Sequence, residues 1–226
     1  MATENNLMSQ LVFKFPFTTK YYEQDYYVST NNFSAYRLIE SWPNWPGKWV
    51  NIYGPSGSGK THLSNILKKK IDSVKILNAK YIDNKTISGF EKLDCVIIDN
   101  FEENIDEFIF YTLLNQSRQL NNFIVINSIL PIKDVKFKLN DLKSRAESFT
   151  NLGIDLPTDD LLRVIISKSF SDKQIEVTPK ISEYIIKNIE RSYEKVFKFI
   201  KEIDDLSLSS GKSININLIK KVLIDE

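Results

Sequence analysis

The stretch WVNIYGPSGSGKTHL, residues 49–63, decides the fold of this chain. It begins with a β-branched and aromatic run, residues 49–53, that is typical of a short strand. Residues 54–61 then match G-x-x-x-x-G-K-[ST] without a gap. Leu63, Ile66 and Leu67 follow as the start of a helical apolar stripe. Strand, glycine loop and helix therefore come in the order that a phosphate-binding loop requires.

This loop carries the residue types that bind the phosphates of a nucleotide. Glycines let backbone N–H groups turn inward, and the helix N-terminus adds a partial positive charge. Lys60 is expected to reach the β- and γ-phosphates, and the Thr61 hydroxyl is expected to ligate Mg²⁺. The predicted phosphate-binding residues are Gly54, Pro55, Ser56, Gly57, Ser58, Gly59, Lys60 and Thr61.

The composition limits the class of protein. The chain has 226 residues, and its 30 Lys+Arg against 29 Asp+Glu give a net charge of +1. That balance gives no electrostatic basis for strong direct binding to DNA or to a membrane. Cys95 is the only cysteine, so no internal disulfide forms and a reducing compartment is expected. With no membrane-spanning stretch and no signal peptide in the sequence, we expect a cytoplasmic protein.

Two later apolar runs end in polar residues. Residues 94–99 are typical of a buried parallel strand, and Asp99 at its end is the expected second Mg²⁺ ligand of a P-loop site. Residues 123–128 predict another buried strand. At its carboxyl end, either Asn127 or Ser128 is expected to sense the γ-phosphate or to orient water, and the alternative is a polar strand cap.

The remaining pattern predicts an α/β domain followed by a helical one. Strands are expected at 74–79 and, as the last and shortest, at 154–156. Helices are expected at 106–120 and 139–149. Thr158 is expected to cap the first of a series of helices near 158–170, 179–191, 193–208 and 217–224. We therefore predict an N-terminal segment at 1–20, an α/β nucleotide-binding domain at 21–156 and an all-α lid domain at 157–226.

The N-terminal segment contains one largely apolar motif, QLVFKF at residues 10–15. An edge strand is the simpler interpretation. The alternative is a docking peptide, since Gln10 with Leu11, Phe13 and Phe15 resembles the peptide by which bacterial proteins bind the sliding clamp of DNA polymerase.

Several of these motifs agree with one family. The chain resembles the AAA+ ATPases of the bacterial replication initiator DnaA and, more closely, the shorter Hda proteins (HdaA in α-proteobacteria), which promote inactivation of DnaA. The matching segments, which extend over nearly the whole chain, are residues 10–15, 25–28 with 31–32, 42–46, 61–63, 99–100 and 142–145. The resemblance implies a five-stranded parallel AAA+ sheet with a helical lid.

The resemblance also implies ligands, partners and site residues. The ligands are ADP or ATP with Mg²⁺, and the partners are DnaA and the sliding clamp, with self-association of the chain as a further expectation. Tyr27, Val28 and His62 match the family's nucleotide-side positions, although Ser29 replaces the usual glycine. Arg145 matches the arginine finger, which would act on ATP held by a neighbouring DnaA subunit.

Two departures from the family pattern concern hydrolysis. Asn100 stands where many AAA+ proteins keep the acid that activates water, and an amide cannot take up a proton, so slow self-hydrolysis is expected. Glu194 falls where the family has its second-sensor arginine. Arg191 or Lys195 is the candidate substitute. Because a carboxylate would repel the γ-phosphate, ADP is expected to bind more favourably than ATP.

Other classes of P-loop protein also carry this loop. A helicase loader or a transposition helper is the nearer one, but such proteins usually have a basic face. A small-molecule kinase usually has an arginine-rich lid, whereas this lid region contains only Arg163 and Arg191.

Overall fold

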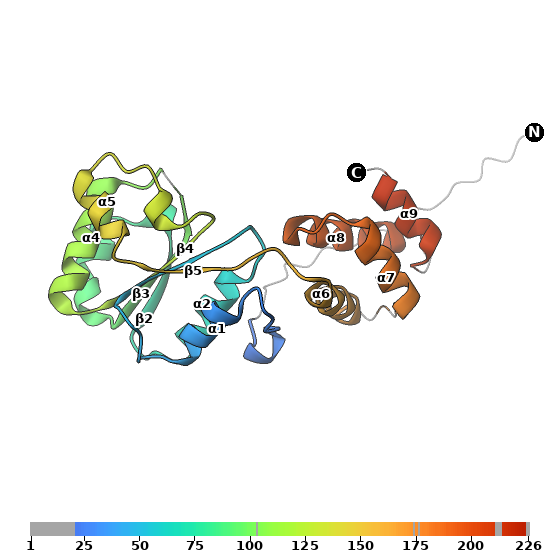
Figure 1. Cartoon of the computed structure of the whole chain (residues 1–226), viewed down its shortest axis with the longest axis horizontal. Coiled ribbons are helices and arrows are strands. Elements are labelled where there is room, and N and C mark those ends of the chain that lie inside the picture. Colours follow the sequence, from blue (N-terminus) through green and yellow to red (C-terminus); the bar gives the residue numbers. More distant parts are fainter. Residues whose placement is uncertain (1–20, 103, 174, 176, 211–213, 225–226) are drawn as a thin grey trace, which may run out of the picture. The chain divides into compact units, whose positions relative to one another are not determined.

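The computed structural model describes residues 21–102, 104–173, 175, 177–210 and 214–224. The chain divides into two compact units, one formed by Tyr21–Pro157 and the other containing the residues from Thr158 onward. Figure 1 shows a sheet with helices in the first unit and helices alone in the second. Each unit is described by itself.

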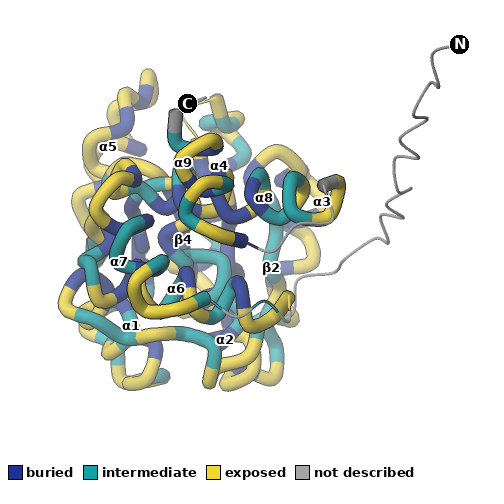
Figure 2. Tube along the Cα trace, turned by 90° about the vertical axis from the view of Figure 1, so that its right-hand side faces the viewer, coloured by how far each residue is buried: buried dark blue, intermediate teal, exposed yellow. Residues whose placement is uncertain are grey.

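The first unit is built on a five-stranded parallel sheet in the order β2-β3-β4-β1-β5. The strands are β1 (Trp49–Tyr53), β2 (Val74–Asn78), β3 (Cys95–Phe101), β4 (Phe123–Ser128) and β5 (Thr150–Gly153). The central strand β4 is buried along its whole length (Figure 2). Such continuous burial is what its unbroken apolar run predicts for a parallel strand covered on both faces. The predicted α/β fold with a five-stranded parallel sheet is confirmed.

Helices cover both faces of this sheet (Figure 1). One face packs against α1 (Phe33–Glu40) and α2 (Lys60–Lys68), with Ile39 and Leu63 fully buried there. The other packs against α4 (Glu107–Leu120) and α5 (Asn140–Ala146), with Phe110 and Leu142 in the core. The connecting segments contain α3 (Asn84–Ser88) and the 3-10 turns η1 (Glu23–Asp25), η2 (Ala79–Tyr81), η3 (Phe90–Lys92) and η4 (Ile132–Asp134).

The prediction of the last strand at 154–156 was wrong, because β5 is Thr150–Gly153. β1 ends at Tyr53, which pairs with Gly153, so β1 offers no further strand partner beyond that point. The backbone N–H of Ile154 still reaches the Tyr53 carbonyl at 2.8 Å, but the N–H of Asp155 donates to the carbonyl of Asn31 at 3.1 Å. The chain thus leaves the sheet at the residues that were expected to form the strand.

The second unit is helical. It contains α6 (Asp159–Ser171), α7 (Pro179–Asn188), α8 (Tyr193–Ser210) and α9 (Ile216–Ile224) around its own apolar core. The Thr158 hydroxyl accepts a bond from the Leu161 N–H at 3.3 Å, so Thr158 caps α6 as predicted.

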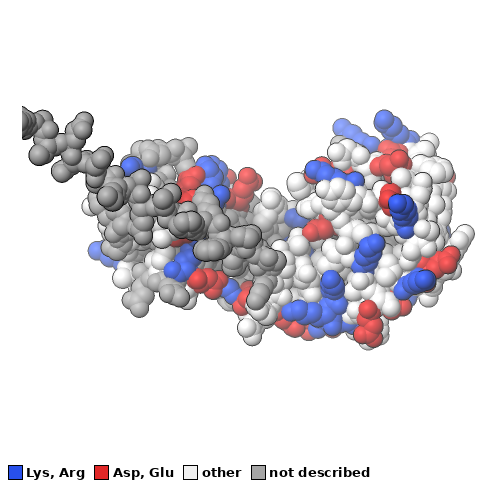
Figure 3. All heavy atoms as spheres, turned by 180° about the vertical axis from the view of Figure 1, so that it is seen from behind, with Lys and Arg blue, Asp and Glu red and all other residues white. Residues whose placement is uncertain are grey.

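Charge and hydropathy of the described residues add two observations. None of the described helices is long and apolar enough to cross a membrane. On the face that Figure 3 displays, acidic and basic side chains are interspersed over the described part of the surface.

Candidate functional site

The glycine loop between β1 and α2 has the backbone that its sequence predicts. Gly57 and Gly59 have φ of 77° and 93°, which is the left-handed region that glycine adopts without steric cost. At Gly59 an added Cβ would lie 3.0 Å from the ring of Tyr26. The loop is therefore closed on one side by an aromatic ring, and a residue larger than glycine would strain the backbone and crowd this ring.

Lys60, the first residue of α2, is folded back over this loop. Its ammonium donates to the carbonyls of Gly54 at 2.7 Å and Pro55 at 2.8 Å. Burial lowers the pKa of Lys60, and the negative charge of Asp99 opposes that shift. The ammonium is thus held at the loop by weak neutral acceptors, which phosphate oxygens can replace.

Thr61 and Asp99 are brought together across the sheet edge. The Thr61 hydroxyl donates to Asp99 Oδ2 at 2.8 Å, and Asn127 Nδ2 donates to Asp99 Oδ1 at 3.0 Å. This follows from the strand order, because β4 lies between β1 and β3. Asn127, near the end of β4, therefore lies between Asp99 on β3 and the helix that follows β1. The hydroxyl and the carboxylate are oxygen ligands of the kind that Mg²⁺ prefers. No cluster of three or more His, Cys, Asp or Glu that would hold a metal occurs among the described residues, so further ligands would come from phosphate and water.

The two candidate sensors on β4 have different surroundings. Asn127 is fully buried and also donates to Ser64 Oγ at 2.7 Å, while its own Oδ1 has no hydrogen-bond partner. Ser128 donates to the Leu130 carbonyl at 2.6 Å and accepts from Asn51 Nδ2 at 2.8 Å. The geometry therefore favours Asn127 over Ser128 as the residue that faces the phosphate site.

The nucleotide-side segment lies next to the loop. His62 Nε2 is 2.7 Å from the Tyr22 carbonyl, and its ring meets the Tyr26 ring edge-on at 5.2 Å. Tyr27 is 43% exposed, and its carbonyl accepts from Asn32 Nδ2 at 2.9 Å. Val28 follows it and is half-buried.

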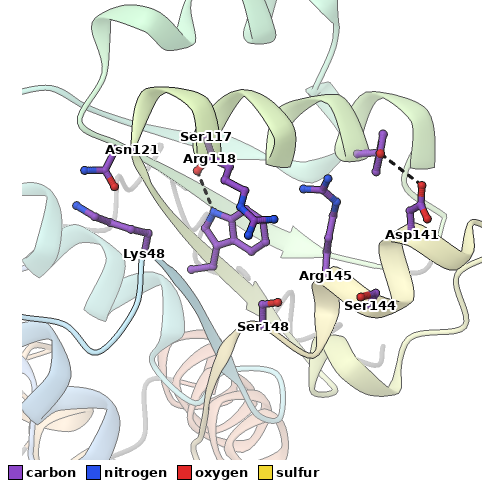
Figure 4. A pocket seen from close by; sticks show the side chains of 10 residues that line it. Lys48, Ser117, Arg118, Asn121, Asp141, Ser144, Arg145 and Ser148 are labelled. Carbon is purple, nitrogen blue, oxygen red and sulfur yellow. Dashed lines mark hydrogen bonds between the residues drawn. The ribbon is translucent and has the colours of Figure 1, made fainter.

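Arg145 lies far from this loop within the same unit. It is on α5 and lines a cavity together with Lys48, the residue before β1, and Asn121, two residues before β4, at the amino ends of these strands (Figure 4). The phosphate loop follows the carboxyl end of β1. The guanidinium of Arg145 lies 4.7 Å from the centroid of the Tyr111 ring, and Nη1 is buried without a hydrogen-bond partner.

Comparison with known proteins agrees with this geometry. A family model described as RNA helicase matches residues 50–145. The chromosomal replication initiator protein DnaA of Buchnera aphidicola is 27% identical over 97% of this chain and 54% of its own length. Domain III of the Thermotoga maritima initiator DnaA, at 19% identity, superposes with a TM-score of 0.76 over 93% of this chain and 98% of that one. A DnaA solved with AMPPCP and single-stranded DNA superposes with a TM-score of 0.68 at 20% identity, over 83% of this chain and 65% of that one.

The chain is similar in sequence to DnaA proteins and has the AAA+ fold. It spans about half the length of the curated DnaA relatives that it matches, at 54% and 55% of the first two. Replication initiation is accordingly the context of its relatives.

Of the remaining predicted residues, Arg145 is the one that the described first unit contains together with the phosphate loop. Arg145 lies at the other end of β1, as described above. The sensor candidates Arg191 and Lys195 belong to the helical unit, where the Arg191 guanidinium is 3.1 Å from Asp159 Oδ1. The predicted clamp-binding residues lie outside the described residues; they are Gln10, Leu11, Phe13 and Phe15.

Sequence reasoning missed Tyr26 in this DnaA-like site. Tyr26 and Tyr27 are consecutive aromatic residues, and the motif alone placed the contact one residue later, at Tyr27. The structure packs the Tyr26 ring against Gly59, His62 and Tyr36. The sequence signal was an aromatic residue in the family's nucleotide-side segment, and this signal does not distinguish two adjacent tyrosines.

Proposed function

We propose that this chain is a nucleotide-binding regulator of replication initiation of the Hda type. It binds the DNA-loaded sliding clamp through residues 10–15 and stimulates hydrolysis of ATP held by a neighbouring DnaA subunit. Its own site binds ADP or ATP, with phosphates at residues 54–61 and Mg²⁺ at Thr61 and Asp99. Bound Mg²⁺ neutralises phosphate charge.

The residues present fit that nucleotide. The glycines leave room for phosphate oxygens, Lys60 is already directed at the loop, and the two candidate Mg²⁺ ligands lie within hydrogen-bond distance of each other. Asn127 holds the Asp99 carboxylate in place. The next residue, Asn100, has an amide at the position where a catalytic base would act. These features support nucleotide binding with slow turnover.

The observation that carries the regulatory part of the proposal is the position of Arg145. Among the described residues, no carboxylate lies within ion-pair distance of its guanidinium. The phosphate loop follows the opposite end of β1, which is five residues long, so Arg145 cannot serve the phosphates of its own chain. A fixed guanidinium in that place is available to the phosphates of another subunit.

Arg145→Ala tests this role. We expect the variant to keep ADP binding and clamp binding but to lose most of its stimulation of ATP hydrolysis by DnaA, by about 10³-fold or more as for other arginine fingers. The measurement is single-turnover hydrolysis of ATP on DnaA in the presence of clamp and DNA. Arg145→Lys should restore little of the stimulation, since an ammonium lacks the bidentate geometry.

Lys143→Ala provides the matched control. Lys143 is an exposed cation on the same helix, and its ammonium donates to Asn140 Oδ1 at 3.3 Å. This variant should stimulate hydrolysis normally. Full stimulation by Arg145→Ala, with the fold verified by ADP binding, would refute the proposed mechanism.

A further inference from the structure

A cavity of about 560 Å³ lies between α4, α5 and the segments that precede β1 and β4 (Figure 4). This volume is within the range of about 300 to 1,000 Å³ that is usual for ligand pockets. Asp141, Ser144 and Arg145 recur at helical spacing on α5 and face the cavity, as do Tyr111 and Arg118 two turns apart on α4. Two helices thus direct polar faces into one space.

Three cations line this cavity against one carboxylate. Lys48, Arg118 and Arg145 contribute the positive charges, and Asp141 contributes the negative one. Asp141 accepts a hydrogen bond from the Tyr111 hydroxyl at 3.4 Å, and no ion pair joins it to any of these cations among the described residues. The cavity therefore has an uncompensated positive charge, although the chain as a whole is nearly neutral.

Two of these three cations, Arg145 and Lys48, lie over aromatic rings. Arg145 stacks on Tyr111 at 4.7 Å, and the Lys48 ammonium lies 3.7 Å from the centroid of the Phe123 ring. Arg145 Nη1 is a buried donor without an acceptor. A buried donor normally has a partner, so an anionic ligand in the cavity would supply the acceptor that the protein lacks.

The contacts of the lining aromatic residues favour a phosphate over a nucleobase as the ligand. The Tyr111 ring face is covered by Arg145, and Trp49 is only 9% exposed, with its indole N–H donated to Ser117 Oγ at 2.9 Å. Neither of these lining aromatic residues is free to stack a nucleobase, as single-strand binding requires. Ser144, Ser148 and Asn121 add neutral polar groups to the lining.

We propose that this cavity binds the terminal phosphates of a nucleoside triphosphate through Lys48, Arg118 and Arg145. Guanidinium groups match phosphate oxygens bidentately, and the ammonium adds a point charge. The triphosphate is either free in solution or held by a neighbouring subunit. The second source rests on the proposed function, whereas phosphate binding by the cavity does not.

The first experiment measures phosphate binding directly. Inorganic tripolyphosphate is titrated into the full chain carrying Lys60→Ala, which disables the phosphate loop, and the side-chain Nε–H signals of the arginines are followed by NMR. We expect the Arg118 and Arg145 signals to shift and to saturate together. Arg118→Ala in the same background should weaken binding at least tenfold, and Arg118→Lys should weaken it less.

Arg37→Ala is the matched control, because Arg37 is an exposed arginine that lies over the Phe33 ring on α1 and does not line the cavity. It removes the same charge and should leave the affinity unchanged. The proposal is wrong if Arg118→Ala and Arg37→Ala weaken binding equally, or if the Arg118 and Arg145 signals do not move. An oligothymidine that shifts these signals at lower concentration than tripolyphosphate would overturn the assignment of the ligand.

The second experiment distinguishes the two sources of the triphosphate. In single-turnover hydrolysis of ATP on DnaA, Arg118→Ala should slow the stimulated rate about tenfold or more if the phosphates belong to the neighbouring subunit. An unchanged rate, together with tripolyphosphate binding, assigns the cavity to free polyphosphate. If the unaltered chain fails to stimulate DnaA, the proposed function fails while the binding measurement still decides on the cavity.

Discussion

Lys60 is held at the phosphate loop by two carbonyl oxygens, and the phosphates of ADP would offer it stronger, charged acceptors. Hydrogen bonds to charged groups contribute about 1.5 to 3 kcal/mol each. Lys60→Ala should therefore reduce ADP affinity by at least about tenfold. Isothermal titration calorimetry with ADP measures this loss.

Lys70→Ala is the control for that measurement. Lys70 follows the same helix and pairs with Glu40 at 2.9 Å on the surface, where such pairs contribute about 0 to 1 kcal/mol to stability. Its replacement should not change ADP affinity. Equal affinities of the Lys60→Ala variant and the unaltered chain would rule out the phosphate-loop function.

We propose that Asn100 limits how fast the chain hydrolyses ATP bound at its own site. Its backbone N–H donates to Asp99 Oδ1 at 3.1 Å, and its φ is 54°, a conformation that Asn and Asp tolerate. Because the amide is no base, we expect turnover well below about 1 per second, the lower end of usual enzyme rates. Asn100→Asp should keep the backbone conformation and raise the rate of phosphate release.

The rate of phosphate release, measured with radiolabelled ATP, tests both statements about Asn100. Glu102→Gln is the accompanying control, since Glu102 is the next described acid along the chain. A fast rate in the unaltered chain that disappears in Glu102→Gln would identify Glu102 as the base and contradict the role given to Asn100.

At the scale of elements, the sequence predicted those parts of the fold that have their own periodicity or motif. The loop after β1, the acid on β3 and the apolar run of β4 each have a local signature, and the structure has all three. β5 has none, because Thr150 and Asn151 are polar and Gly153 is typical of a turn. Its strand conformation comes from pairing with β1, which no local pattern reports.

The cavity between α4 and α5 could not be predicted for a related reason. Lys48 and Arg118 are 70 residues apart in the sequence, and neither belongs to a motif that the sequence analysis identified. Only the tertiary packing of two helices against the sheet places them beside Arg145. Arg145 itself was found through a family motif and not through its surroundings.

Asn51 connects strand β1 to β4 and to the loop that follows it. Its Nδ2 donates to the Ile126 carbonyl at 3.1 Å and to Ser128 Oγ, and its Oδ1 accepts from the Ile132 N–H at 2.8 Å. Asn51 is fully buried. Asn51→Ala would leave these groups unsatisfied, and each such group costs about 1 to 3 kcal/mol. We expect the free energy of unfolding to fall by about 2 to 4 kcal/mol, measured by urea denaturation.

Asn84→Ala is the comparison for Asn51. Asn84 is the exposed first residue of α3, and surface changes of this kind usually alter stability by less than about 0.5 kcal/mol. A loss of less than about 1 kcal/mol in Asn51→Ala would mean that water or a neighbouring group replaces the lost bonds.

At the scale of the whole molecule, the proposed function assigns clamp binding and stimulation of DnaA to separate parts of one chain. Gln10 and Phe13 belong to the N-terminal segment, and Arg145 belongs to the α/β unit. Anchor residues of a peptide interface are worth about 2 kcal/mol or more, so Gln10→Ala with Phe13→Ala should weaken clamp binding by about 30-fold or more. ADP affinity should stay unchanged, and a pulldown with purified clamp together with calorimetry measures both.

Because the clamp peptide and Arg145 are separate sites, a variant that has lost only Arg145 should interfere with the unaltered chain. A chain with Arg145→Ala keeps the clamp peptide, so in excess it should occupy a limiting clamp and suppress the stimulation of DnaA by the unaltered chain. Clamp binding raises the local concentration of the chain near DnaA, so loss of the clamp position removes that advantage. Adding Gln10→Ala and Phe13→Ala to the same variant should abolish the suppression. The measurement is single-turnover hydrolysis of ATP on DnaA with both chains present and clamp limiting. Equal suppression by both variants would show that they compete for DnaA and not for the clamp, and the peptide would then have no part in the mechanism.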